Sequence, residues 1–360
     1  MALLEVNDLT VRFYTQEGVV TAVDGLSYQI ERGEKFGVVG ESGAGKSVTA
    51  LSLMRLIDSP GRIESGEILF KGQNILEMSE KEVRSLRGNE IAMIFQDAQT
   101  ALNPVYTVGE QIAEAIRHHL GYSDTEAKER TIQLLDQVGI PEPETRYSDY
   151  PHEFSGGMQQ RAVIAMALSC DPDLLLCDEP TTALDVTIET QILDLIEELA
   201  DEFDTAVQLI THDLGVVADI CDRVMVMYAG KPVEKAPVEE LYYDPQHPYT
   251  VGLMSSIPRV GDKRDRLQTI PGTMPDLVEL PPGCSFHPRC PFAEEACTTK
   301  EPALIDIETG GQATATSERA AACLEYTGDL TTGLDYEVTV VDEETETTAE
   351  TTHTGGNHNV

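Results

Sequence analysis

The sequence predicts an α/β protein built around a sheet of buried parallel strands. Three short apolar runs, 174–177, 207–210 and 224–227, are separated by polar or helical segments, which is the pattern of such strands. A fourth run, 35–39, leads into a glycine-rich loop, and an apolar pattern at helical spacing follows from 47 to 57. Strands that alternate with helices in this way define the fold class.

The remaining segments differ from this core in composition and in the secondary structure that their patterns predict. Residues 1–39 read as short strands joined by turns, and 107–140 carry a helical stretch that Pro141 and Pro143 close. Beyond about 235 the chain is Pro-rich and irregular, and it contains no basic residue after Arg319. The last residues, rich in Thr and Glu, are typical of a disordered, solvated tail. We therefore expect an α/β core domain over 1–235 with a helical subdomain near 97–165, an extension over 236–325 and a tail over 326–360.

The charge balance excludes one class of partner. The 360 residues include 25 Lys and Arg against 63 Asp and Glu, a formal net charge of −38. Such a surface repels phosphate backbones, so we expect no nucleic-acid partner. A cytoplasm rich in salt selects strongly charged, hydrated surfaces of this kind, and the composition therefore predicts a halophilic source.

The sequence shows no segment typical of a chain embedded in a membrane. The start alternates apolar and polar residues, without the basic head and apolar stretch of a signal. No window approaches the roughly 20 apolar residues that a membrane span needs. We expect the chain to stay in the cytosol and to reach a membrane only through a partner. In that reducing compartment its seven cysteines are not expected to form structural disulfides.

A phosphate-binding loop is the first motif that carries chemistry. The segment 40–47, GESGAGKS, fits the pattern GxxxxGKS between a predicted strand and a predicted helix. Its backbone N–H groups and the helix N-terminus can surround phosphates, Lys46 can reach the β and γ phosphates, and Ser47 can hold Mg²⁺. The expected nucleotide-binding residues here are Gly40, Glu41, Ser42, Gly43, Ala44, Gly45, Lys46, Ser47 and Val48.

Two adjacent acids follow a predicted strand. The run 174–177 ends in Asp178 and Glu179, which suits Asp178 to a position near Mg²⁺ and Glu179 to polarising the attacking water. Adjacent acids at a strand end are, alternatively, often only exposed to solvent.

A second anion site is indicated at 154–161, FSGGMQQR, where a serine and two glycines open a helix. Because one phosphate loop suffices for one ATP, this second site suggests service to a partner's nucleotide.

The order of these motifs resembles the ATPase subunit of ABC transporters over roughly residues 3–235. The matching elements are GESGAGKS, Gln96, FSGGMQQR, LLLCDEP, Ala183-Leu184-Asp185 and His212. The resemblance implies a P-loop NTPase domain with an antiparallel β subdomain and a helical signature subdomain. It also implies ATP and Mg²⁺ as cofactors, and two such subunits that close head to tail around two nucleotides.

The resemblance also implies a role for each matching residue. Gln96 resembles the glutamine that touches Mg²⁺, beside Ser47 and Asp178, and senses the membrane subunit. His212 resembles the switch histidine, so that the implied catalytic residues are Glu179, His212 and Lys46. The signature loop for the partner's nucleotide would comprise Ser155, Gly156, Gly157 and Gln159, and Asp185 would be the D-loop residue.

The residue that stacks on adenine is expected upstream of the loop. Phe13 lies at the expected distance, and Tyr14 is its neighbour. An aromatic residue of a strand core is the competing interpretation of Phe13.

Two further segments resemble the oligopeptide and dipeptide importers. Residues 95–104 match the segment that receives the permease, although Ala98 and Gln99 replace the usual Pro and Met. The motifs 247–250, HPYT, with Leu253 and Pro258, and 284–291, CSFHPRCP, match their C-terminal extension. The resemblance implies ATP-driven uptake of peptides at the cytoplasmic face of the membrane, with two permeases, a second ATPase and an extracellular solute-binding protein. Nickel and some sugar importers share the extension and are the alternative.

Four cysteines in the extension form a candidate metal set. They are spaced C-x5-C-x6-C-x25-C, and four thiolates can hold tetrahedral zinc or an iron-sulfur cluster. The resemblance to the importer family implies a [4Fe-4S] cluster, and unliganded buried cysteines are the alternative. The candidate ligands are Cys284, Cys290, Cys297 and Cys323. Cys170, Cys177 and Cys221 are expected only to pack in the core.

Two other functions would use the same ATPase motifs. A soluble ABC ATPase of DNA repair or translation would show a long coiled-coil insertion or two cassettes, and the sequence has neither. A partner subunit that binds ATP without hydrolysing it would not be expected to keep both Glu179 and His212. The motifs therefore favour a hydrolysing transport subunit.

Overall fold

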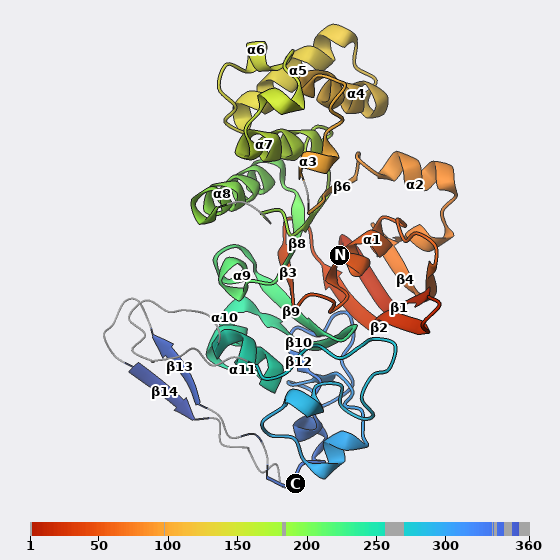
Figure 1. Ribbon diagram of the computed structural model, residues 1–360, viewed down its shortest axis with the longest axis vertical. Helices are drawn as coiled ribbons and strands as arrows, with labels where there is room; N and C mark the ends of the chain where they lie inside the picture. Colours follow the sequence, from red (N-terminus) through yellow and green to blue (C-terminus); the bar gives the residue numbers. More distant parts are fainter. Residues whose placement is uncertain are drawn as a thin grey trace.

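The central parallel sheet appears where the buried apolar runs predict it. The computed structural model describes residues 2–96, 98–181, 185–255, 270–332, 334, 337–341 and 348–352. The parallel strands lie in the order β9-β3-β8-β7-β6. Their bounds are β3 Lys35–Val39, β6 Ile91–Ile94, β7 Leu174–Asp178, β8 Ala206–Thr211 and β9 Arg223–Tyr228. The prediction of buried parallel strands is confirmed (Figure 1).

Three antiparallel strands extend this sheet beyond β9. They are β10 (Lys231–Pro237), β12 (Ala320–Ala321) and β11 (Ile305–Asp306). Ala320 pairs with Lys235 and Ala321 with Glu234, so residues of the extension complete the edge of the main sheet. The domain boundary suggested near 235 therefore falls inside a strand, because β10 continues the hairpin that begins in β9.

A second, antiparallel sheet holds the N-terminal part of the chain. Its order is β2-β1-β4-β5, with β1 Leu4–Tyr14, β2 Val19–Ile30, β4 Gly61–Phe70 and β5 Gln73–Asn74. The expectation of short strands was wrong here. β1 and β2 have 11 and 12 residues and pair along their whole length. The register of this pairing shifts within β1, but the strand continues through these irregular positions.

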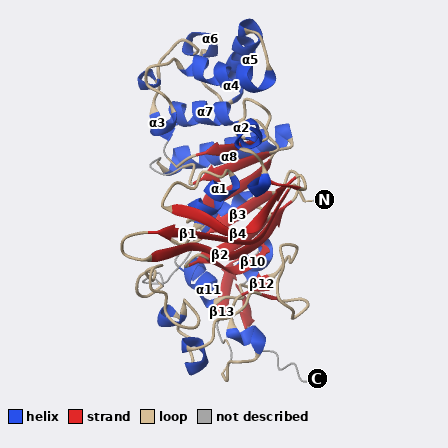
Figure 2. Ribbon diagram, turned by 90° about the vertical axis from the view of Figure 1, so that its right-hand side faces the viewer, coloured by secondary structure: helices blue, strands red, loops and turns tan. Residues whose placement is uncertain are grey.

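Helices surround the sheets and form one separate layer. Figure 1 shows α4 to α7 gathered at one end of the molecule, and Figure 2 shows the strands between these helices and the extension. The helices are α1 Lys46–Leu53, α2 Glu80–Leu86, α3 Ala98–Ala101, α4 Val108–Leu120, α5 Asp124–Gln137, α6 Pro143–Arg146, α7 Gly156–Ala167, α8 Val186–Phe203, α9 Leu214–Ile220, α10 Val238–Tyr243 and α11 Pro248–Ser255. The 3₁₀ helices are η1 Ile75–Glu77, η2 Pro151–Glu153, η3 His287–Arg289, η4 Glu295–Thr298 and η5 Leu324–Thr327.

The helical stretch expected over 107–140 is two helices. Gly121 ends α4 with a φ of 69°, a conformation that favours glycine. Ser123 then caps α5 in a capping box with Glu126. Pro143 opens α6 rather than closing the stretch, because a proline fits the first turn of a helix.

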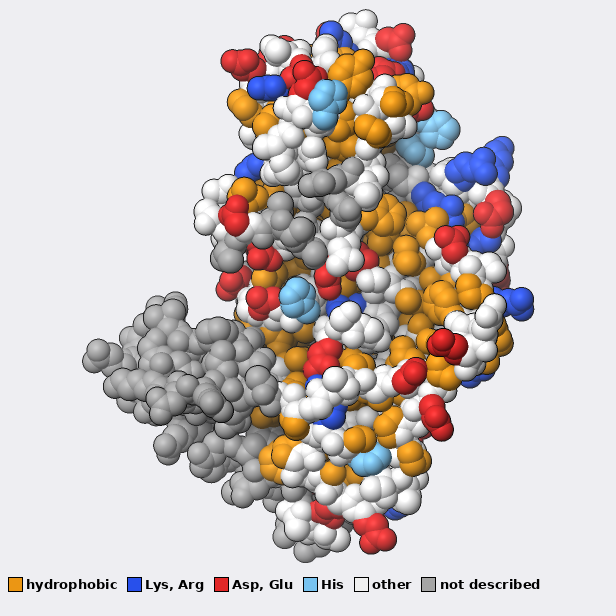
Figure 3. Space-filling view, in the orientation of Figure 1, with side chains coloured by type: hydrophobic (Ala, Val, Ile, Leu, Met, Phe, Trp, Pro, Cys, Tyr) orange, Lys and Arg blue, Asp and Glu red, His pale blue; other side chains and the backbone are white. Residues whose placement is uncertain are grey.

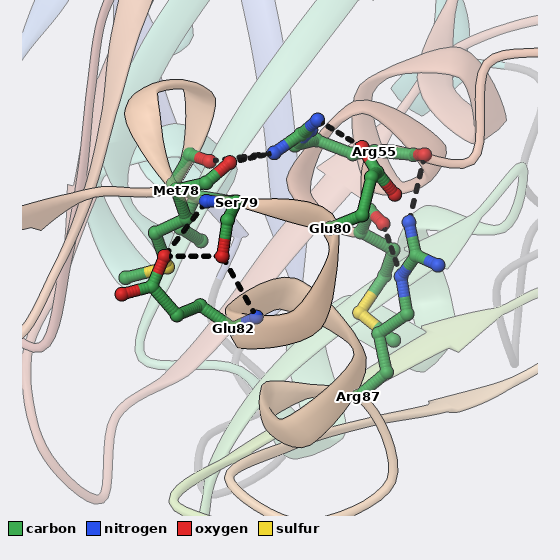
Figure 4. Close-up of polar contacts among 8 residues, drawn as sticks. Arg55, Met78, Ser79, Glu80, Glu82 and Arg87 are labelled. Carbon is green, nitrogen blue, oxygen red and sulfur yellow. Dashed lines mark hydrogen bonds and ion pairs between the residues drawn. The ribbon is translucent and has the colours of Figure 1, made fainter.

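Helix α1 ends at Leu53, earlier than the expected Ile57. Arg55 takes a left-handed φ of 48°, which stops the helix. Arg87 then donates to the carbonyl oxygens of Met54 (2.7 Å) and Arg55 (2.9 Å), and Arg55 itself donates to the carbonyl oxygen of Met78 (2.6 Å) (Figure 4). These contacts satisfy the open end of α1 and hold it against α2, which fixes the helix that follows the phosphate loop.

The core has two parts, one on each face of the parallel sheet. Neighbouring residues of a strand point to opposite faces, so Val38 and Val39 belong to different buried clusters.

The surface of the molecule carries many acidic side chains. Figure 3 shows them scattered over the visible face, from the helical layer to the extension. Among the described residues, no helix has the length and apolar character that crossing a membrane requires.

Part of the acidic tail is described. Within 326–360, for which the composition predicts disorder, β13 (Glu337–Val341) and β14 (Thr348–Thr352) pair as an antiparallel hairpin, with Glu337 opposite Thr352. Residues 342–347 and 353–360 lie outside the described parts.

Candidate active site

The phosphate loop runs from the end of β3 to the start of α1, and close packing explains two of its glycines. A Cβ on Gly40 would lie 2.3 Å from the carbonyl oxygen of Met227. A Cβ on Gly45 would lie 2.2 Å from the carbonyl oxygen of Ala22, and Gly45 also has a φ of 100°. No side chain fits at either position, because backbone carbonyl oxygens of β9 and β2 pack directly against the loop there.

Lys46 is held inside the loop. Its side chain is 5% exposed, and Nζ donates to the carbonyl oxygens of Gly40 (2.7 Å) and Glu41 (3.1 Å). Nζ also lies 3.9 Å from Oε1 of Glu179. Burial lowers the pKa of Lys46, and the nearby carboxylates oppose that effect. The loop therefore encloses a positive charge that phosphate oxygens could approach.

Asp178 and Ser47 form a pair of oxygen groups beside the loop. The Ser47 hydroxyl donates to Oδ1 of Asp178 at 2.9 Å. Burial raises the pKa of Asp178, and the charge of Glu179 adds to this effect. A carboxylate and a hydroxyl are ligands that Mg²⁺ prefers, and a divalent cation would offset the cost of a buried carboxylate. The two residues fit a magnesium site.

Glu179 lies beside three residues that were predicted to act with it, Lys46, Gln96 and His212. Its Oε2 accepts a hydrogen bond from Nε2 of Gln96 at 2.9 Å, and its Oε1 lies 3.8 Å from Nδ1 of His212. Glu179 has a φ of 46°, and its N–H donates to the carbonyl oxygen of Ile210 on β8. A carboxylate with a histidine and an amide beside it can orient a water and accept its proton.

These groups open into one cleft of about 750 Å³. Of the predicted nucleotide residues, Phe13 and 41–48 line it, together with Gln96, Glu179 and His212. Gly40 and Asp178 lie behind this lining. Tyr14 is directed elsewhere, because its hydroxyl donates to Glu64 at 2.8 Å. Sequence reasoning missed four apolar residues of the lining: Val20, Ala22, Leu253 and Leu277.

The predicted signature and D-loop residues do not line this cleft. Ser155 caps α7 by accepting from the N–H of Met158, and a Cβ on Gly156 would meet no atom within 4 Å. Gln159 donates to the carbonyl oxygens of Pro151 (2.7 Å) and Phe154 (3.3 Å). Asp185 caps α8 through the N–H of Ile188. Ala183 and Leu184 fall outside the described residues. The start of α7 thus has space for a group that this chain's own cleft does not supply.

Residues far along the chain contact the phosphate loop, which no motif indicated. The hydroxyl of Tyr249 accepts from the N–H of Glu41 at 2.9 Å. Arg289 donates two hydrogen bonds to the Glu41 carboxylate. Both residues lie within segments that resemble the importer extension, HPYT and CSFHPRCP, and that position is the only signal the sequence offers.

The four extension cysteines lie around a single small cavity. Burial raises the pKa of Cys290 and of Cys323 to about 12, and burial also raises the pKa of Cys284. Backbone N–H groups of Phe286, Phe292 and Glu325 face these thiols. The donor types suit a metal, but the cavity is about 20 Å³, room for about one water. Among the described residues, no group of three or more His, Cys, Asp or Glu side chains is gathered closely enough to hold a metal ion. The thiols as placed therefore do not fit an iron-sulfur cluster.

Comparison with known proteins identifies two family regions. The family described as "ABC transporter" matches residues 23–182, and the one described as "Oligopeptide/dipeptide transporter, C-terminal region" matches 233–297. Among solved structures, the dimeric ATP-binding cassette MJ0796 bound to ADP and Pi has a TM-score of 0.58 and 26% identity, and the match covers 65% of this chain and 98% of that one.

Curated relatives match over most of the chain. A protein of Sinorhizobium fredii named as a probable peptide ABC transporter ATP-binding protein is 54% identical over 89% of this chain and 94% of its own length. The oligopeptide transport ATP-binding protein OppD of Salmonella typhimurium is 52% identical, over 83% of this chain and 89% of its own length. The dipeptide transport ATP-binding protein DppD of Escherichia coli is 49% identical, over 87% of this chain and 95% of its own length. The chain belongs to the ABC transporter ATP-binding proteins, in the branch that carries the oligopeptide/dipeptide transporter C-terminal region.

Proposed function

We propose that this chain is the ATP-hydrolysing subunit of an ABC importer that drives uptake of dipeptides or oligopeptides. The observation that carries the proposal is the cleft, where Lys46, the Ser47–Asp178 pair and Glu179 lie together in a chain that also has the importer extension. The names of the relatives supply the substrate class. Nickel or sugar import by the same motor remains the second candidate.

Within the cleft each residue has a proposed task. The loop 40–48 and Phe13 bind the nucleotide, and Lys46 meets the β and γ phosphates. Ser47, Asp178 and Gln96 hold Mg²⁺, which lowers the cost of charge developing on the γ-phosphoryl group. Glu179 accepts the proton of the attacking water, and His212 helps to orient it. The contacts among Gln96, Glu179 and His212 support this assignment.

A second ATPase subunit completes the site in this proposal. Ser155, Gly156, Gly157 and Gln159 lie outside the cleft of their own chain, and the space at Gly156 can admit a partner's γ-phosphate. The N-terminus of α7 favours an anion. Two chains arranged head to tail would place each signature loop, and the Asp185 D-loop, at the partner's nucleotide.

Membrane subunits are the other proposed partners. Exposed apolar side chains occur in the segment 95–106, which includes Gln96: Phe95 is 43% exposed, Val105 70% and Tyr106 56%. Such side chains suit contact with a permease, and we propose two permeases, with a solute-binding protein on the far side of the membrane and no nucleic acid. The chain would act as a peripheral subunit at the cytoplasmic face.

The domain division and two finer assignments stay proposals. Residues 1–235 would form the ATPase domain, with a helical subdomain at 97–165, followed by an extension over 236–325 and a tail over 326–360. A [4Fe-4S] cluster on Cys284, Cys290, Cys297 and Cys323 would require an arrangement of the thiols other than the one described above, and iron and sulfide analysis after anaerobic purification tests it. The net charge of −38 supports a halophilic source.

One experiment tests the transport proposal. The tagged chain is purified anaerobically from host membranes in high salt, and its companions are identified by mass spectrometry. Two permeases, a second ATPase and a solute-binding protein are expected. A chain that purifies alone, or with ribosomes or DNA, would contradict the importer and leave only the ATPase.

A further inference from the structure

One residue of the phosphate loop is held by the distant C-terminal part of the chain. Nη1 of Arg289 donates to Oε2 of Glu41, and Nη2 donates to Oε1, both at 2.9 Å. The backbone N–H of Glu41 donates to the hydroxyl of Tyr249, also at 2.9 Å. The side chain and the backbone of Glu41 are therefore both fixed by residues more than 200 positions away.

Arg289 is itself firmly placed for this contact. The residue is 7% exposed, and its Nε donates to the carbonyl oxygen of Pro271 at 2.8 Å. Its guanidinium lies over the ring of Tyr228, 5.7 Å from the centroid, and Tyr228 packs edge-on against Tyr249. A planar fork that is fixed by a third hydrogen bond and an aromatic face matches a carboxylate better than any other side chain does.

The charge of Glu41 explains why its carboxylate has to be paired with Arg289. Glu41 lines the nucleotide cleft, and its charge acts on Lys46, the cation of the loop. A free carboxylate there would repel the phosphates of ATP and compete for Lys46. Pairing with Arg289 neutralises this charge and restrains the side chain.

We propose that Arg289 is a positioning residue for the nucleotide, which keeps the Glu41 carboxylate paired so that the loop accepts MgATP. Through this contact, the folding of the extension and the affinity for the nucleotide are linked. The inference rests on the proposed binding of ATP in this cleft. Arg289 acts through Glu41 and has no proposed role in the chemical step.

The competing explanation is that Arg289 only docks the extension onto the ATPase core and has no effect on nucleotide binding. The chain offers a matched control for that explanation. Arg319 also lies in the extension, and it pairs with Asp244 (2.5 Å) and Glu240 (3.3 Å) on the α10 side. Its side chain is 19% exposed, so it is largely buried like Arg289. It holds the later part of the extension to α10, which packs against α9 and β9 of the ATPase core, and it does not touch the phosphate loop. A docking role predicts similar effects for the two arginines, and a positioning role does not.

The test measures binding of a fluorescent ATP analogue to the purified full chain in excess Mg²⁺. Arg289→Gln is expected to weaken binding about tenfold, a typical size for linkage between two sites. Arg289→Lys keeps the charge but not the fork, and it is expected to bind about threefold more weakly than wild type. Arg319→Gln should bind within about twofold of wild type. The double variant Glu41→Gln with Arg289→Gln should bind as tightly as Glu41→Gln alone, because no carboxylate is then left unpaired.

The affinities of these variants separate the possibilities, and the melting temperature of each variant is measured alongside. Wild-type affinity in Arg289→Gln, or equal losses in Arg289→Gln and Arg319→Gln, would overturn the inference. If Arg289→Gln does not fold, wild-type affinity in Arg289→Lys would overturn it instead. Lys46→Ala is the reference for the site itself: retained binding in that variant would refute the proposed nucleotide site, whereas lost binding there with no effect at Arg289 would refute only the positioning role.

Discussion

Replacing Glu179 by glutamine separates nucleotide binding from hydrolysis. The side chain keeps its shape but can no longer accept the proton of water. Its carboxylate lies 3.9 Å from Nζ of Lys46, and at an effective dielectric constant of 20 that attraction is worth about 4 kcal/mol. This attraction holds Lys46 near Glu179 and competes with the attraction of Lys46 for phosphate. Glu179→Gln is therefore expected to bind MgATP at least as tightly as the wild type.

Turnover should change in the opposite direction. A positioned general base contributes about 10²- to 10⁴-fold, so ATP hydrolysis by the assembled importer should fall by at least about 100-fold. Phosphate release reports turnover, and a fluorescent ATP analogue reports binding, at the same salt and Mg²⁺ concentrations. Turnover within tenfold of wild type would refute the role of Glu179. Loss of binding would instead show that its main effect is on the shape of the cleft.

Three other predictions follow from single contacts. A Cβ added at Gly156 would meet no atom within 4 Å, so Gly156→Asp should leave the melting temperature unchanged while lowering turnover of the assembled importer about 100-fold or more; normal turnover would contradict the signature role. Gly40→Ala places a Cβ 2.3 Å from the carbonyl oxygen of Met227 and should lower the free energy of unfolding by about 2 kcal/mol, and an unchanged urea midpoint would contradict this. Burial raises the pKa of Glu234 from 4.5 to about 7, so its contribution to stability is fully present below pH 4.5 and is lost as the pH rises through 7. Between those limits the stability of wild type relative to Glu234→Gln should fall by about 3 kcal/mol in urea unfolding, and a constant difference would refute the shift.

The predictable parts of the fold are those in which local pattern and tertiary packing agree. The strands β3, β7, β8 and β9 are buried on both faces, so their apolar runs identify them directly. Helix ends were harder, because they depend on single backbone conformations. Gly121 splits the predicted helical stretch, and Arg55 ends α1 by taking a left-handed φ that its residue type does not announce.

The residues of the site also fall into two groups, those that a local sequence pattern predicts and those that it does not. Motif residues that follow a strand, such as Glu179 and His212, meet because the carboxyl ends of parallel strands share one edge of the sheet. The contacts of Arg289 and Tyr249 with Glu41 span more than 200 positions, and no local pattern encodes them. Leu253 and Leu277 line the cleft for the same reason: the extension folds back over it.

The helix that carries the proposed signature residues is hydrogen-bonded to the segment that follows Glu179. Buried Gln160, on α7, donates from Nε2 to the carbonyl oxygen of Pro180 at 2.6 Å, one residue beyond Glu179. In the proposed pair of subunits, α7 would face one nucleotide while Glu179 faces the other. A shift of α7 on closing over the first ATP would move the carboxylate at the second. Turnover should then depend on ATP concentration with a Hill coefficient above one, and loss of the Gln160 amide should bring that coefficient toward one.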